Sequence, residues 1–227
     1  MPLRAIVFDF DGVLANSEPL HLRAYQDVLA DEGIAITERD YYARYLGYDD
    51  VGAFVAIGAD HGRTWRPGDI DRLVRIKAER MEVLERDVSV LFPGAADVVR
   101  RAAGVVPIAI ASGALGREIR RVLDRETLTG LFSAIVAAED TTVSKPSPEP
   151  YMEAVARLQA VGGADLAAGD CVAIEDSQWG LQSARAAGLR TVAVAQTYDE
   201  SELRSADLVI ASIDRLDLRT LNELCSS

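Results

Sequence analysis

Near its N-terminus the chain reads Ala5-Ile6-Val7-Phe8-Asp9-Phe10-Asp11-Gly12, a short apolar run followed at once by acidic residues and a glycine. A continuous apolar run that contains β-branched residues predicts a strand covered on both faces. Gly12 permits a tight turn directly after that strand. The segment therefore predicts a buried strand whose carboxyl end carries the carboxylates of Asp9 and Asp11.

Similar apolar runs recur along the rest of the chain, at residues 107–111, 134–138, 171–174, 191–195 and 208–211. Most are separated by helix-length segments with apolar residues three and four apart, such as residues 96–103, 117–123, 150–158 and 180–187. Strands and helices that alternate in this way are typical of a parallel sheet with helices on both faces. We therefore expect an α/β fold with a doubly wound parallel sheet.

From about residue 18 to residue 86 the alternation is interrupted by a stretch with helical patterns only. Its periodic segments are residues 20–32, 40–46 and 69–85, separated by the helix breakers Gly47, Gly58, Gly62 and Pro67-Gly68. We predict a core domain formed by residues 1–15 and 88–227, and an inserted helical cap domain formed by residues 16–87. Ligands of open parallel sheets bind beyond the carboxyl ends of the strands, so a cap inserted after the first strand would cover the binding site.

The composition is that of a soluble globular protein, with 49% hydrophobic and 26% charged residues among 227. Acidic residues outnumber basic ones 36 to 24, the formal charge is -12, and no Lys/Arg-rich run occurs. Nucleic acid is therefore not an expected partner. The same excess of negative charge repels phosphorylated ligands, so a phosphate site here needs a local cation or oriented backbone amides.

The cysteines and the N-terminal segment of the chain indicate in which cellular compartment the protein is expected. Cys171 and Cys225 lack metal-ligand spacing, and we expect Cys171 in the core and Cys225 in a loose tail. We recognise neither a secretory leader nor an apolar stretch of roughly 18 residues that could span a membrane. We expect a cytoplasmic protein without membrane association, present as a monomer or a weak homodimer.

A second acidic pair, Glu175-Asp176, follows the apolar run 171–174. In a parallel sheet this pair lies on the same edge as Asp9 and Asp11, so the four carboxylates can converge on one cation. Mg²⁺ prefers such hard oxygen ligands and commonly combines carboxylates with a substrate phosphate. Each motif alone also has a simpler interpretation: a solvated Asp-Gly turn for the first pair, and a helix N-cap for the second.

Ser112 and Lys145 are candidates for binding a phosphoryl group. Ser112 ends the run 107–111 and precedes Gly113, so its hydroxyl and the nearby amides could hold a phosphoryl oxygen, although a plain helix cap would have the same sequence. Lys145 lies in Ser144-Lys145-Pro146-Ser147-Pro148, where the prolines stiffen the chain, as suits a cation that must be aimed. A surface lysine in a proline-rich loop is the alternative.

The order Asp-x-Asp-Gly, Ser, Lys-Pro and Glu-Asp is far more specific than any one motif. With its flanking residues it resembles the haloacid dehalogenase superfamily, and within it the β-phosphoglucomutase-like, CbbY-like branch. The resemblance covers nearly the whole chain, with matching motifs at residues 8–14, 16–21, 110–113, 144–148 and 174–180, and at Ala184 and Ala187-Gly188. It implies a Rossmann-like core with an inserted helical cap.

The resemblance also implies roles for the residues of the first motifs. Asp9 would attack phosphorus and form an aspartyl-phosphate, while Asp11 would act as general acid and base. Ser112, Gly113 and Lys145 would hold the oxygens of the transferring phosphoryl group.

Metal binding and one cap residue follow from the same resemblance. Mg²⁺ would be bound by the Asp9 side chain, the Asp11 backbone carbonyl and the Asp176 side chain, with Glu175 as a further ligand or water holder. His21 matches a histidine at the base of the family's cap, which makes it a candidate substrate-binding residue. A hydrogen-bonded structural histidine is the alternative.

These features predict a magnesium-dependent phosphatase that acts on a small phosphorylated metabolite, such as a sugar or polyol monophosphate. A sugar phosphomutase of the β-phosphoglucomutase type remains open, but the family's mutases use a cap lysine and arginine around a glycine. The corresponding segment here, Tyr45-Leu46-Gly47-Tyr48-Asp49-Asp50, places an apolar residue and an acid at those positions. A catalytically idle regulatory protein on the same fold is a third alternative.

Overall fold

The computed structural model describes residues 2–46, 48, 50–86 and 89–226. The chain forms two compact units, one made of Met1–Asn16 with Val90–Ser227 and the other of Ser17–Ser89. We call them the core unit and the helical unit. Residue 88, where the sequence analysis begins the second part of the core, lies outside the described residues, as do Gly47 and Asp49 of the loop that bears on mutase activity.

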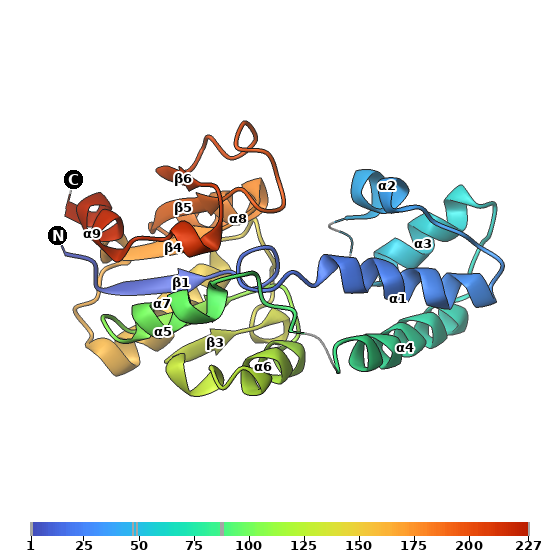
Figure 1. The fold of residues 1–227 in the computed structure, drawn as a ribbon, viewed down its shortest axis with the longest axis horizontal. Coiled ribbons are helices and arrows are strands. Elements are labelled where there is room, and N and C mark those ends of the chain that lie inside the picture. The colour runs from blue at the N-terminus through green and yellow to red at the C-terminus, as the bar shows by residue number, and fades with distance from the viewer. Residues whose placement is uncertain (1, 47, 49, 87–88, 227) are drawn as a thin grey trace. The chain divides into compact units, whose positions relative to one another are not determined.

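The core unit is built on a six-stranded sheet in the order β3-β2-β1-β4-β5-β6, and all its strand pairs are parallel (Figure 1). The strands are β1 Ala5–Phe8, β2 Ile108–Ala111, β3 Ala134–Val136, β4 Cys171–Glu175, β5 Arg190–Val194 and β6 Leu208–Ile210. This confirms the predicted doubly wound parallel sheet. In the register, Phe8 pairs with both Ile110 and Ile174, so the residues that follow β1, β2 and β4 emerge together at one edge.

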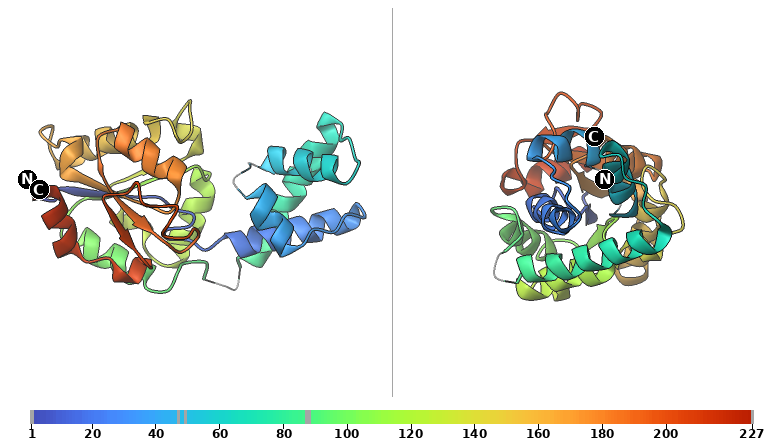
Figure 2. Two further views of the ribbon diagram at one scale, coloured as in Figure 1. Left: turned by 90° about the horizontal axis from the view of Figure 1, so that it is seen from above. Right: turned by 90° about the vertical axis from the view of Figure 1, so that its right-hand side faces the viewer.

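Helices cover both faces of this sheet. They are α5 Ala95–Ala103, α6 Gly116–Arg125, α7 Glu149–Gly162, α8 Gln178–Ala186 and α9 Leu218–Ser226, with 3₁₀ turns at Thr129–Leu131, Ala138–Asp140, Ala168–Asp170 and Ile213–Arg215. Figure 2 shows α7 and α8 on one face, and α5 and α9 on the other. Each strand from β1 to β5 is therefore sandwiched, which explains its almost unbroken apolar sequence.

Helix α7 packs on the central strands through one apolar row. Its buried residues Tyr151, Ala154, Val155 and Leu158 follow the spacing i, i+3, i+4, i+7 of an amphipathic helix, and they join one cluster with Val7 of β1. Burial of each large apolar side chain contributes about 1.5–3 kcal/mol. This packing fixes the start of α7 close to the strand ends that carry the acidic residues.

The end of the chain differs from the sequence-based prediction. Cys225, expected in a loose tail, is buried in α9, which packs near the start of β4. The reason is that Leu221 and Cys225 lie four residues apart on one face of the helix and supply an apolar surface that the sheet covers. Cys171 is buried in β4, as expected.

The helical unit consists of α1 Glu18–Asp31, α2 Glu38–Asp40, a π-helix at Tyr41–Tyr45, α3 Asp50–Asp60 and α4 Pro67–Leu84. The sequence predicted one helix over residues 40–46, but a capping box of Thr37 with Asp40 starts the turn earlier, and the chain then continues as a π-helix. Gly58, predicted to break a helix, lies inside α3. No helix in the described residues is long and apolar enough to cross a membrane.

Candidate active site

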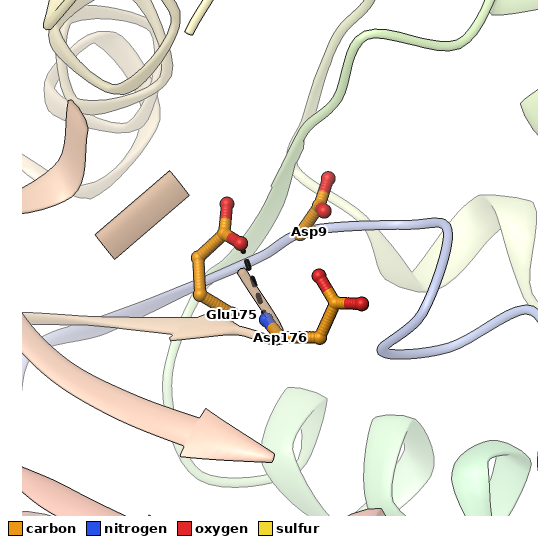
Figure 3. A group of neighbouring side chains, drawn as sticks. All are labelled: Asp9, Glu175 and Asp176. Carbon is orange, nitrogen blue, oxygen red and sulfur yellow. Dashed lines mark hydrogen bonds between the residues drawn. The ribbon is translucent and has the colours of Figure 1, made fainter. Parts of the chain in front are cut away.

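Three carboxylates meet at the carboxyl edge of the sheet in the core unit. Asp9 directly follows β1, Glu175 ends β4, and Asp176 comes next, with ligand oxygens all within 4.8 Å of one another. Figure 3 shows the three side chains gathered there, with the backbone N–H of Asp176 donating to the Glu175 carboxylate. The sequence-based prediction that the two acidic motifs lie on one edge therefore matches the arrangement of these residues.

Two glycines make this close approach possible. Gly12 has a φ of +77°, and a Cβ there would lie 1.9 Å from Oδ2 of Asp176. A Cβ on Gly180 would lie 1.9 Å from the carboxyl carbon of Glu175. Any side chain at either position would push a carboxylate out of the cluster, because interiors are close-packed.

Lys145 supplies a cation to the cluster. Its Nζ lies 2.9 Å from Oδ1 of Asp9 and 2.6 Å from Oε1 of Glu175. The side chain is only 14% exposed, so the surface-lysine interpretation of the proline-rich loop is wrong. The ammonium is therefore in direct contact with the carboxylate of Asp9, the residue expected to be the nucleophile.

The electrostatics of the cluster show that it carries too much negative charge for one ammonium. Burial raises the pKa of Asp9 to about 7, although Lys145 opposes the shift. Burial, with the charges of Glu175 and Asp9, raises the pKa of Asp176 well above its ordinary value. The pKa of Lys145 is also raised, because the attraction of Asp9 and Glu175 outweighs the opposing effect of burial. Both carboxyl shifts point to a site that would accept a further cation.

The donor set of this site fits Mg²⁺. Asp9 and Asp176 offer oxygen ligands that converge, and the residual negative charge is of the kind that a divalent cation neutralises. Glu175 differs from them, because its Oε1 accepts from Lys145 and Tyr151 and its Oε2 accepts from the backbone of Asp176 and from Ser177. Each oxygen of Glu175 therefore accepts two hydrogen bonds, and Glu175 holds Lys145 in the same group that offers ligands to a metal.

The other residues predicted for the site in the core unit, Asp11, Ser112 and Gly113, follow strands β1 and β2. Asp11 is half-buried in the turn after β1, and its side chain is not part of the three-carboxylate group. Ser112 is buried directly after β2, and its Oγ accepts a hydrogen bond from the backbone N–H of Ala114. Gly113 is exposed beside it. Helix α6 begins only at Gly116, so Ser112 is not the cap of that helix.

The acidic pair is not a helix cap either. Ser177 is the N-cap of α8, and its Oγ accepts from the backbone N–H of Gly180 at 3.1 Å. Glu175 and Asp176 are thereby left free of the capping role that their sequence context also suggested.

The site is also supported by residues that the sequence analysis did not identify. Gln196, just after β5, donates to the backbone carbonyls of Gly12 and Val13 and accepts from the N–H of Ile213. The Thr197 hydroxyl hydrogen-bonds Asp176 and opposes the rise of its pKa. Both follow a predicted strand, so the rule that found the acidic pairs could have found them. Tyr151 carried no such signal, because an aromatic residue on an apolar helix face reads as core.

His21 lies in the helical unit, on α1. Its Nδ1 is 2.7 Å from Nζ of Lys77, which also pairs with Asp50 at 2.5 Å. A lysine ammonium can only donate, so Nδ1 of His21 is the acceptor. Burial first, and then the charge of Lys77, lower the pKa of His21 to about 3. The substrate-binding role of His21 stays a prediction.

The fold and the site together define a class of protein: an α/β enzyme with a doubly wound parallel sheet and, at the carboxyl edge of that sheet, an acidic cluster that could bind a cation. The family model described as haloacid dehalogenase-like hydrolase matches residues 3–188. The chain belongs to this family of hydrolases.

Individual relatives place it within the family. It is 28% identical to protein CbbY of Rhodobacter capsulatus over 99% of this chain and 100% of that protein. It is 30% identical to hexitol phosphatase B of Escherichia coli K12, over 96% of each. A β-phosphoglucomutase structure from Clostridium difficile superposes with a TM-score of 0.81 at 20% identity, covering 99% and 97% of the two chains. The chain therefore lies in the β-phosphoglucomutase-like, CbbY-like branch.

Proposed function

We propose that this protein is a magnesium-dependent phosphatase that hydrolyses a sugar or polyol monophosphate through an aspartyl-phosphate on Asp9. The observation that carries the proposal is the buried cluster of Asp9, Glu175 and Asp176 with the Lys145 ammonium held against the nucleophile. Phosphoryl transfer depends on positioning and on charge neutralisation, and this cluster offers both.

In the first step an Oδ atom of Asp9 forms a bond to phosphorus, and the bond from phosphorus to the leaving oxygen breaks. Asp11 gives its proton to that oxygen, so the alcohol departs neutral. In the second step water attacks phosphorus, Asp11 takes the proton of the water, and the bond to Asp9 breaks. Inorganic phosphate leaves, and both aspartates return to their starting states.

Lys145, Ser112 and Gly113 bind the phosphoryl oxygens in this scheme. Lys145 supplies a positive charge beside the attacking carboxylate, and charge developing on the oxygens in the transition state strengthens that interaction. Ser112 and the exposed Gly113 follow the neighbouring strand, one and two positions beyond Ala111, the residue level with Asp9.

The metal site uses the side chains of Asp9 and Asp176 and the backbone carbonyl of Asp11. A bound Mg²⁺ neutralises the excess charge of the cluster and of the phosphate, which lets two anions approach each other. Glu175 is a further ligand or a water holder in this scheme, and it also pairs with Lys145.

The substrate class rests on the relatives. Hexitol phosphatase B, by its name, acts on phosphorylated hexitols. The test is a panel of phosphorylated sugars, polyols and nucleotides, assayed for released phosphate with and without Mg²⁺. Release confined to sugar and polyol monophosphates supports the proposal, whereas a preference for nucleotides contradicts its substrate class.

A sugar phosphomutase is separated from a phosphatase by its products. A mutase must protect its aspartyl-phosphate from water while a bisphosphate reorients. On β-glucose 1-phosphate with a trace of the 1,6-bisphosphate, we expect free phosphate to form faster than glucose 6-phosphate. The reverse order would make the protein a mutase.

A further inference from the structure

Tyr151 is a fully buried residue of α7 whose side chain has a single polar atom, and that atom contacts the site. Its hydroxyl donates to Oε1 of Glu175 at 2.7 Å. The ring packs in the apolar cluster under the sheet, so the hydroxyl has no freedom to choose another acceptor. A buried phenol needs an acceptor, and here the acceptor is a fully buried carboxylate.

The same carboxylate oxygen also accepts from Lys145. Nζ lies 2.6 Å from Oε1 of Glu175, 2.9 Å from Oδ1 of Asp9 and 5.1 Å from the centroid of the Tyr151 ring. The ammonium is therefore shared between two carboxylates while it rests on the face of an aromatic ring. Its position depends on how strongly each carboxylate attracts it.

The remaining oxygen of Glu175 is held from the other side. Oε2 accepts from the backbone N–H of Asp176 at 3.1 Å and from the Ser177 hydroxyl at 3.3 Å. Glu175 therefore cannot rotate toward Asp9 without breaking several hydrogen bonds in a dry environment. Because Tyr151 occupies one lone pair of Oε1, less of the negative charge of that oxygen is left for Lys145.

We propose that Tyr151 is a positioning residue, which fixes Glu175 and so holds the Lys145 ammonium in reach of Asp9. Without the hydroxyl, Oε1 has a free lone pair and attracts Lys145 more strongly, which draws the ammonium away from the nucleophile. The inference rests on the proposed phosphatase function, since Lys145 must act on a phosphoryl group for its position to matter.

The first test is Tyr151→Phe, which keeps the ring and removes the hydroxyl. We expect kcat to fall about tenfold, with KM within about threefold, because small misplacements of a catalytic group affect the transition state most. The matched control is Thr191→Val, which removes another buried hydroxyl that donates to a carboxylate, that of Asp207 at 2.9 Å. This control should keep kcat within about twofold.

A second test does not depend on turnover. Beryllium fluoride with Mg²⁺ places a phosphoryl mimic on a catalytic aspartate, and its fluorine resonances report the donors around it. In Tyr151→Phe, we expect at least one fluorine resonance to shift relative to the parent protein, and none to shift in Thr191→Val. A fluorine spectrum unchanged by Tyr151→Phe, or a kcat within twofold of the parent, would overturn the positioning role. A parent protein that releases no phosphate from any substrate overturns the proposed function itself.

Discussion

Each unit holds a largely covered lysine, and the two lysines have different surroundings. In the core unit, Lys145 faces the carboxylates of Asp9 and Glu175, with Asp176 beside them. In the helical unit, the Lys77 side chain is 2% exposed and pairs with Asp50, and its other partners are the neutral ring of His21 and the face of Tyr25. Lys145 forms ion pairs with two carboxylates, whereas Lys77 forms one with Asp50 and also interacts with the charge of the partly buried Glu18.

This difference in charge balance separates a chemical site from a structural one. Burial of an unbalanced set of charges is costly, and burial accordingly raises the pKa values of Asp9 and Asp176. In the Lys77 cluster, the Tyr25 hydroxyl and Lys77 both donate to Oδ1 of Asp50 and lower the pKa of that acid against the effect of burial. The charge of Lys77 also opposes the rise that burial causes in the pKa of the neighbouring Glu18. Asp50, the acid of the loop in which mutases have a cation, is therefore paired with Lys77 in the structure.

The largest expected effect on turnover is that of a substitution at Asp9. Asp9→Asn removes the nucleophile while keeping its size, so we expect turnover to fall by about four orders of magnitude or more. Phosphate release under saturating substrate is the measurement, with circular dichroism to show that the fold is retained. Activity within tenfold of the parent would mean that the unbalanced cluster is not a nucleophilic site.

Metal removal tests whether the negative charge of the acidic cluster in the core unit needs a divalent cation for activity. Chelation should silence the enzyme, Mg²⁺ should restore it, and Ca²⁺ should inhibit, because Ca²⁺ favours longer bonds and more ligands and so misplaces the phosphoryl group. Released phosphate is measured in each condition. Full activity in excess chelator would contradict the metal site at Asp9 and Asp176.

A substitution at Lys77 tests whether the Lys77–Asp50 pair stabilises the helical unit. Lys77→Met leaves the Asp50 carboxylate without its cation, and we expect a loss of about 2–3 kcal/mol in the free energy of unfolding, measured with urea. The matched control is Arg80→Met on the exposed side of the same helix, which should change stability by less than about 0.5 kcal/mol. Equal stability of the two variants would remove the structural role of the cluster.

The smallest expected effect is a pH dependence through His21. Its pKa is about 3 in the folded protein and about 6.5 when exposed, so between these values the unfolded chain binds the proton and the folded chain does not. Stability is therefore fully present above pH 6.5 and falls as the pH is lowered toward 3.

Between pH 7.5 and pH 5 we expect His21 to account for about 2 kcal/mol of lost stability, from urea unfolding at each pH. His21→Asn keeps an acceptor for Lys77 but has no proton to gain, so its stability should fall less over this range. Identical pH profiles of parent and variant would show that His21 does not titrate in this way.

Most of the fold was predictable because its signals are local. The predicted apolar runs coincide with the six strands of the sheet to within a residue or two at each end, since strands buried on both faces must be apolar throughout. The helix α9 and the π-helix at Tyr41–Tyr45 were missed, because each depends on packing partners far away in sequence or on a cap.

Within the site, strand ends were predictable and contacts were not. Residues such as Asp9 and Glu175 follow recognisable strands, so parallel topology alone places them on one edge.

In the helical unit, Lys77 had a partial signal in the sequence. It occupies the buried row formed by Ile70, Leu73 and Met81 on α4, where a charged residue requires a partner. The identity of that partner could not be derived from spacing.

The sequence by itself determined the order of strands and helices, the acidic motifs and their common edge, because periodicity and parallel topology require no knowledge of distant contacts. Only the tertiary structure decided that Tyr151 and Lys145 share one oxygen of Glu175, and that Lys77 is neutralised by Asp50. Hydrogen bonds depend on distances of a few tenths of an ångström between segments far apart in the chain. Packing sets those distances, and no local pattern encodes them.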